Sequence, residues 1–100
     1  MTPAAHIAAA IEILDLILSG ENAEASLTKW GRSNRFAGSG DRHAIRDIVF
    51  DALRQKNSLT KRSKKISGRS WIIALLKKRE VNVNEYFETS RYSPPEIKKW

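Results

Sequence analysis

One stretch of the sequence predicts a helix more clearly than any other: SGDRHAIRDIVFDALR, residues 39–54. Its apolar residues recur at intervals of three, one, three and one, which places them on one helix face. They are Ile45, Ile48, Val49, Ala52 and Leu53. Ser39 stands where a helix cap is expected, and Asp41 stands where the helix dipole favours a negative charge. Asp51 and Arg54 are spaced for an ion pair. We expect this helix to be the packing centre of the fold.

The residues before this stretch predict two more helices. Thr2-Pro3 is a typical helix start, and a stripe spaced four, three and four predicts a core-facing helix that ends at Ser19-Gly20. The stripe consists of Ile7, Ile11, Leu14 and Leu18. A shorter helix is predicted over 21–33, with Ala23, Leu27 and Trp30 on its apolar face, and residues 34–40 read as a loop.

The residues after this stretch also favour helices. Residues 57–69 fit a basic helix end followed by a loop. The run 71–76 fits a buried strand by periodicity alone, but Ala74 and its neighbouring leucines favour a helix over 70–80. A helical turn is expected over 82–87, and Ser93-Pro94-Pro95-Glu96 looks like a further helix start. We therefore expect an all-α bundle of about five helices, truncated on its C-terminal side.

The charge of the chain is concentrated in one segment. Residues 1–51 hold five Lys/Arg and seven Asp/Glu, residues 52–79 hold ten Lys/Arg and no acid, and residues 80–100 hold three Lys/Arg and four acids. A localised positive segment indicates a polyanionic partner, and mixed Lys and Arg can follow a phosphate backbone. The alternative is a solvated surface loop. The predicted RNA-binding residues are Arg54, Lys56, Lys61, Arg62, Lys64, Lys65, Arg69, Lys77, Lys78 and Arg79.

Three smaller patterns have plain structural interpretations. Trp71 borders the basic run, where it could stack on an unpaired base, but it also begins an apolar stripe, which favours core packing. Gly38-Ser39-Gly40 could cradle an anion, yet no strand precedes it, so a turn with a helix cap is favoured. Ser39, His43 and Asp47 share a helix face, but Ser39 and Asp47 lie roughly 12 Å apart along it. We expect only a surface His43–Asp47 pair.

Several classes of protein are disfavoured by composition. The chain has no Cys, so disulfides and thiolate metal sites are excluded. His6 has no second ligand residue nearby in the sequence, and no His/Asp/Glu cluster has the spacing of a metal site. No run of 18 apolar residues and no secretory signal is present. We expect a cytoplasmic protein with neither a metal nor a membrane as partner.

The segment RFAGSGDRHAIRDIVFDALR, residues 35–54, resembles the NusB-like N-terminal domain of bacterial rRNA cytosine-C5 methyltransferases, the Sun/Fmu group related to the nucleolar NOL/NOP enzymes. The shared pattern is Asp41-Arg42 opening a helix that continues to Val49-Phe50-Asp51-Ala52-Leu53-Arg54. Residues 8–20, Gly68-Arg69 and Arg91-Tyr92-Ser93-Pro94 are similar as well, so the resemblance spans nearly the whole chain. It implies a NusB-like RNA-binding domain over residues 1–100, joined to a methyltransferase domain.

The resemblance also implies that RNA binding and catalysis belong to different domains. The expected function is the RNA-binding N-terminal domain of a 16S rRNA cytosine-C5 methyltransferase, which positions rRNA for an S-adenosylmethionine-dependent catalytic domain. That family needs cysteines and a Gly-rich cofactor loop, and this sequence has neither, so we expect no cofactor and no catalysis in this chain. Its expected partners are rRNA and its own methyltransferase domain. A NusB-type antitermination factor is the alternative, although residues 1–28 lack the Arg-rich first helix of that protein. A helical protein-interaction module is the second alternative.

Overall fold

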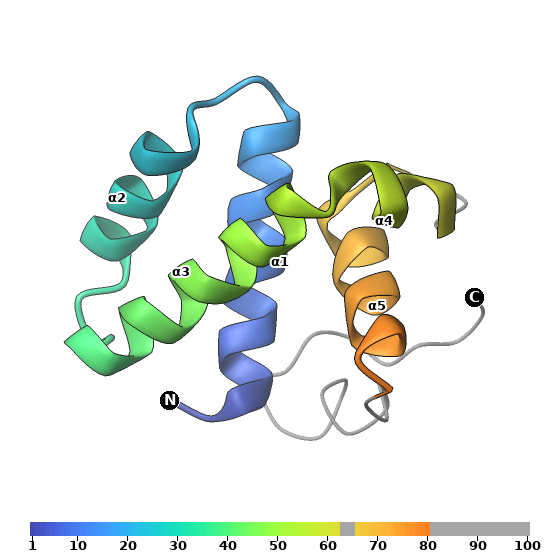
Figure 1. The fold of residues 1–100 in the computed structure, drawn as a ribbon. Helices are drawn as coiled ribbons and strands as arrows, with labels where there is room; N and C mark the ends of the chain where they lie inside the picture. The colour runs from blue at the N-terminus through green and yellow to red at the C-terminus, as the bar shows by residue number, and fades with distance from the viewer. Residues whose placement is uncertain (63–65, 81–100) are drawn as a thin grey trace.

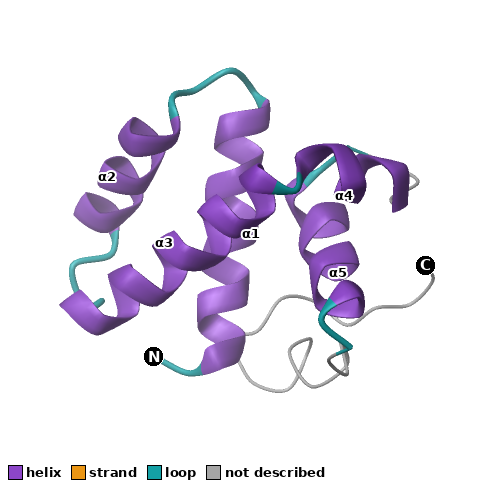
Figure 2. Ribbon diagram, in the orientation of Figure 1, coloured by secondary structure: helices purple, strands orange, loops and turns teal. Residues whose placement is uncertain are grey.

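The computed structural model describes residues 1–62 and 66–80, shown in Figure 1. In those ranges the chain forms helices joined by loops, with no strand, as Figure 2 shows. The five helices are α1 (Pro3–Leu18), α2 (Ala23–Ser33), α3 (Ser39–Arg54), α4 (Lys56–Arg62) and α5 (Gly68–Lys78). The predicted all-α class is confirmed, and the run 71–76 is helical. The patterns at 82–87 and 93–96 lie outside the described residues.

The first helix, α1, is the centre of the fold. It packs against α2, α3 and α5, with α2 and α3 on one side and α5 on the other (Figure 1). The reason is that α1 is apolar around most of its circumference, so that Ile7, Ile13 and Leu14 are all buried. Its buried alanines carry little side-chain bulk and therefore let neighbouring helices come close. The expectation that the helix at 39–54 forms the centre is wrong, because α3 has one apolar face and α1 has several.

The predicted apolar stripes are buried to different degrees. Ile45 and Val49 of α3 are buried, whereas Ile48 and Leu53 are only partly covered. On α1, Leu14 is fully buried and Ile11 is partly buried, but Leu18 is 37% exposed. The prediction for Leu18 is wrong because the last turn of α1 projects beyond its crossing with α3 (Figure 1).

The contact between α1 and α5 depends on one glycine. The backbone N–H of Gly68 donates to Oδ1 of Asp15 at 2.7 Å. A Cβ atom at position 68 would lie only 2.4 Å from the carbonyl oxygen of Ile11. This approach brings the apolar run 71–76 of α5 into the core. Trp71 is 5% exposed, and its Nε1 has no hydrogen-bond partner among the described residues, so the core interpretation of Trp71 is confirmed.

Local capping explains where the helices begin and end. Thr2 Oγ1 accepts a hydrogen bond from the Ala5 N–H at 3.1 Å, which caps α1 as predicted. Gly20, with φ of +112°, ends α1 in the left-handed conformation that favours glycine. For α3 the predicted Ser39 cap is wrong, because Gly38 is the N-cap residue. The expected capping role of Asp41 is confirmed, since its Oδ2 accepts from the Gly38 N–H at 3.1 Å.

Candidate nucleic-acid interface

The segment between α3 and α5 is a short basic helix, α4, where the sequence suggested a basic helix end and a loop. Leu59 is fully buried and anchors α4, which packs against α5. Lys56, Lys61 and Arg62 are exposed, and in the described ranges no carboxylate lies within ion-pair distance of them. We call these three residues the α4 face. Their charges are available to an external anion.

The predicted cations near the end of α5 are tied to their neighbours. Lys78 Nζ donates to Ser58 Oγ of α4 at 3.3 Å, and Arg79 donates to Asp51 of α3. Arg54 also lies near Asp51, at 3.7 Å, which confirms the predicted ion pair. One carboxylate therefore partly neutralises two of the predicted RNA-binding arginines.

The environment of Asp51 keeps its carboxylate ionised. Partial burial on its own would raise the pKa of Asp51. Hydrogen bonds from Arg79 and from Gln55, together with the positive charges of Arg79 and Arg54, outweigh the effect of burial and lower this pKa below its ordinary value. Asp51 thus works as a fixed negative centre that holds the ends of α3 and α5 together.

The remaining predicted cations form no single cluster with these. Arg69 lies in the first turn of α5 and is partly buried, while Lys77 lies in the last turn, roughly 12 Å further along the helix. Lys64 and Lys65 lie outside the described residues. The structure therefore brings α4 and the end of α5 together, through the contact of Lys78 with Ser58, and places Arg69 at the other end of α5.

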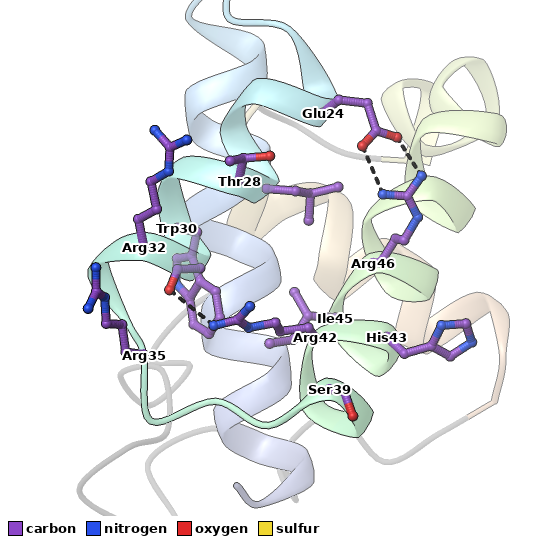
Figure 3. A pocket seen from close by; sticks show the side chains of 12 residues that line it. Glu24, Thr28, Trp30, Arg32, Arg35, Ser39, Arg42, His43, Ile45 and Arg46 are labelled. Atoms are coloured by element: carbon purple, nitrogen blue, oxygen red, sulfur yellow. Dashed lines mark hydrogen bonds and ion pairs between the residues drawn. The ribbon is translucent and has the colours of Figure 1, made fainter.

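A second basic surface lies between α2 and α3, and the sequence did not predict it. A groove of about 850 Å³ opens there, shown in Figure 3. We call it the α2–α3 groove. Four arginines and a histidine contribute to its lining, together with one carboxylate; the charged and titratable lining residues are Arg32, Arg35, Arg42, Arg46, His43 and Glu24.

Within the groove the arginines differ in how they are paired. Arg46 donates to both carboxylate oxygens of Glu24, with a separation of 2.9 Å between Nη1 and Oε2, and its guanidinium also lies 4.8 Å from the centre of the Phe50 ring. Arg32, Arg35 and Arg42 have no carboxylate within ion-pair distance in residues 1–62 and 66–80. Three uncompensated guanidinium groups therefore border this groove.

The net charge of residues 1–51 concealed this surface. All five Lys/Arg of that segment fall between Lys29 and Arg46, where Asp41 is the single acid, and the other six acids of the segment lie before or after this window. In the folded chain Glu12 accepts a hydrogen bond from the Trp30 indole, and Asp15 accepts one from the Gly68 N–H. Neither carboxylate lines the groove. A charge count restricted to residues 29–46, with five Lys/Arg and one acid, was the signal in the sequence that could have indicated this surface.

The histidines have structural roles in the described part of the chain. His6 Nε2 lies 2.8 Å from Oδ1 of Asp41, which is 35 residues further along the chain. The predicted His43–Asp47 pair is confirmed at 3.6 Å, with both side chains exposed, whereas Ser39 is the first residue of α3 and borders the groove. Among the described residues, no group of three His, Asp or Glu could hold a metal ion. No helix in the same ranges is long and apolar enough to cross a membrane.

Comparison of the chain with protein-family models, curated proteins and solved structures gives no significant match. The fold and the surface define the class: a small all-α domain with two basic surfaces, the α4 face and the α2–α3 groove.

Proposed function

We propose that this chain is an RNA-binding helical module. The observation that carries the proposal is the exposed α4 face, whose charges lie in a 28-residue stretch that holds ten Lys/Arg and no acid. Exposed cations without carboxylate partners gain from contact with phosphates, because counterions condensed on the nucleic acid are then released. Trp71 has no part in recognition in the folded chain, because it is buried.

The proposal extends to a biological role through the resemblance of residues 35–54. In this reading the chain is the N-terminal domain of a 16S rRNA cytosine-C5 methyltransferase with a NusB-like fold. It positions rRNA, and the cytosine chemistry belongs to an S-adenosylmethionine-dependent domain outside this sequence. Sequencing the gene downstream of the codon for residue 100 tests this part of the proposal. A methyltransferase domain encoded directly downstream would support it, and a stop codon would contradict it.

Charge reversal tests the RNA-binding function directly. Replacing Lys61, Arg62, Lys64 and Lys65 with Glu should abolish binding to an rRNA fragment, measured by fluorescence anisotropy, while circular dichroism shows an unchanged helical fold. Lys29→Glu is the control, because Lys29 lies on α2, away from α4, and is paired at 3.4 Å with Glu21, which precedes α2. Unchanged affinity of the fourfold variant at moderate salt would rule out the α4 region as the RNA surface.

A protein-docking module is the second candidate, and one observation favours it. Phe36 is 70% exposed and borders a cleft of about 920 Å³ whose lining includes Ala8, Ala9 and Trp30. Exposed aromatic side chains beside an apolar cleft are typical of protein interfaces. If docking is the main function, Phe36→Ser should remove partner binding, and the charge reversals on α4 should leave it intact.

A further inference from the structure

The α2–α3 groove has features of a preformed anion site. Arg42 reaches from α3 toward the end of α2, where its Nη2 donates to the Gly31 carbonyl oxygen at 3.5 Å (Figure 3). Gly31 is buried and has no side chain, and a Cβ there would lie 3.7 Å from Arg42 Cζ, in direct contact with it. Ile45 beneath is also buried. The guanidinium of Arg42 is thus directed across the groove toward the end of α2.

Arg32 and Arg35 supply two further charges at the rim. Figure 3 shows them on the α2 side of the groove, directed outward rather than toward α3. The carboxylate of Glu24 is the only one among the lining residues, and Arg46 already engages both of its oxygens. The groove therefore has one guanidinium group, that of Arg42, between α2 and α3, and two more, those of Arg32 and Arg35, at its outer rim; none of the three has a carboxylate partner in the described part of the chain.

We infer that the α2–α3 groove is a second phosphate-binding site, occupied by the backbone of the same RNA that contacts the α4 face. This inference rests on the proposed RNA-binding function. It assigns to Arg32, Arg35 and Arg42 the contacts with phosphate oxygens.

The chemistry of the lining favours phosphate groups. Every lining residue with a permanent positive charge is an arginine, and the planar guanidinium can bind two phosphate oxygens at once. The hydroxyls of Thr28 and Ser39 also border the groove and can donate to a phosphate. A volume of about 850 Å³ exceeds what a single small ion needs.

The position of the groove favours a polymer over a small anion or a short acidic peptide. Helix α3 connects the groove to the α4 face: Arg42 lies in its first half, and Lys56 follows its end. Arg42 and Arg54, the last residue of α3, are separated by roughly 18 Å of helical rise, and Lys56 begins α4 two residues later. Both surfaces hold exposed cations that lack acidic partners among the described residues. A single polyanion of a few nucleotides can reach both, whereas a mononucleotide or a carboxylate group fills only one.

Salt dependence measures the contribution of the groove. Each phosphate contact on a single strand adds about 0.7 to the slope of log affinity against log salt concentration. The variant R32Q/R35Q/R42Q should therefore lower that slope by about 2 for a single-stranded RNA of about ten nucleotides. K56Q/K61Q/R62Q, which neutralises the α4 face, should lower it by a similar amount. Lys29→Gln, which removes a paired cation beside the groove, should leave it unchanged.

The outcomes separate this inference from the proposed function. If the unmodified chain does not bind RNA, the proposed function fails, and the inference fails with it. If the unmodified chain binds, and only the α4 variant loses slope, the inference alone is overturned. If the groove variant loses binding to polyglutamate but keeps the full slope for RNA, the groove belongs to an acidic protein partner, and the inference is likewise overturned.

A measurement on the unmodified protein covers the case in which the triple variant does not fold. Adding the same RNA should shift the backbone amide NMR signals of Thr28, Gly31 and Ser39. Inorganic phosphate or a mononucleotide at equal concentration should shift them far less. Equal shifts from the small ligands would overturn the inference, as would an RNA titration that moves only signals from α4 and α5.

Discussion

Replacement of Gly68 by alanine tests the close contact between α1 and α5. The added methyl group would lie 2.4 Å from the Ile11 carbonyl oxygen and 2.9 Å from Asp15 Oδ1. The first of these neighbours is helix backbone, so it cannot turn aside as a flexible side chain would. The two helices must move apart, which also weakens the hydrogen bond from the Gly68 N–H to Asp15.

The expected cost follows from these two effects. Overpacking in a filled contact costs about 1–3 kcal/mol, and loss of a hydrogen bond to a charged group costs about 1.5–3 kcal/mol. Alanine returns at most about 1 kcal/mol through its higher helix propensity. We therefore expect Gly68→Ala to lower the free energy of unfolding by about 2–5 kcal/mol. For a chain of this size, that lowers Tm by roughly 8–40 °C.

Urea denaturation followed by circular dichroism measures this change, and Gly40→Ala is the matched control. Gly40 lies in the first turn of α3, is exposed, and has no atom within 4 Å of a built Cβ. Its replacement should be neutral or stabilise the fold by up to about 1 kcal/mol. If Gly68→Ala lies within about 0.5 kcal/mol of the unmodified chain, then α1 and α5 are not packed this closely and the reasoning is refuted.

Three further predictions address the core, the acid stability and the cofactor. Ile13→Ala should lower the free energy of unfolding, measured by urea denaturation, by about 2–5 kcal/mol because Ile13 is fully buried. Leu53→Ala should lower it by less because Leu53 is only partly covered. Equal losses from the two variants would contradict the burial pattern. The hydrogen bond with His6 lowers the pKa of Asp41 most, and the hydrogen bond from the Gly38 N–H lowers it further. The ionised Asp41 carboxylate therefore stabilises the fold above about pH 4, and this contribution is lost as the pH falls through the lowered pKa. Asp41→Asn should therefore flatten the acid limb of stability against pH, and an unchanged limb would count against the interaction. Calorimetric titration with S-adenosylmethionine should give no heat of binding, and a saturable micromolar signal would overturn the assignment of cofactor binding to another domain.

Local signals in the sequence predicted the helices well. The Thr2 cap, the glycine at position 20 and the apolar spacing within 39–54 act over one or two turns, so neighbouring residues suffice to define them. The assignment of Trp71 to the core succeeded for the same reason, since it begins an apolar run. The Ser39 cap was missed by one residue because Gly38, with the Asp41 carboxylate, takes that position instead.

The sequence by itself determined the all-α class, the positions of α1, α2, α3 and α5 and the basic stretch over 52–79, because each depends on residues close together in the chain. Only the tertiary structure decided that α1 is central, that Leu18 is exposed and that a basic groove lies between α2 and α3. In a segment of net negative charge, folding turns acids such as Asp15 and Asp41 toward partners on other helices and leaves Arg32, Arg35 and Arg42 around the groove. A charge count over residues 29–46 shows five Lys/Arg against one acid, but it cannot show that the arginines gather around one groove, because the direction of each side chain is set by packing between helices.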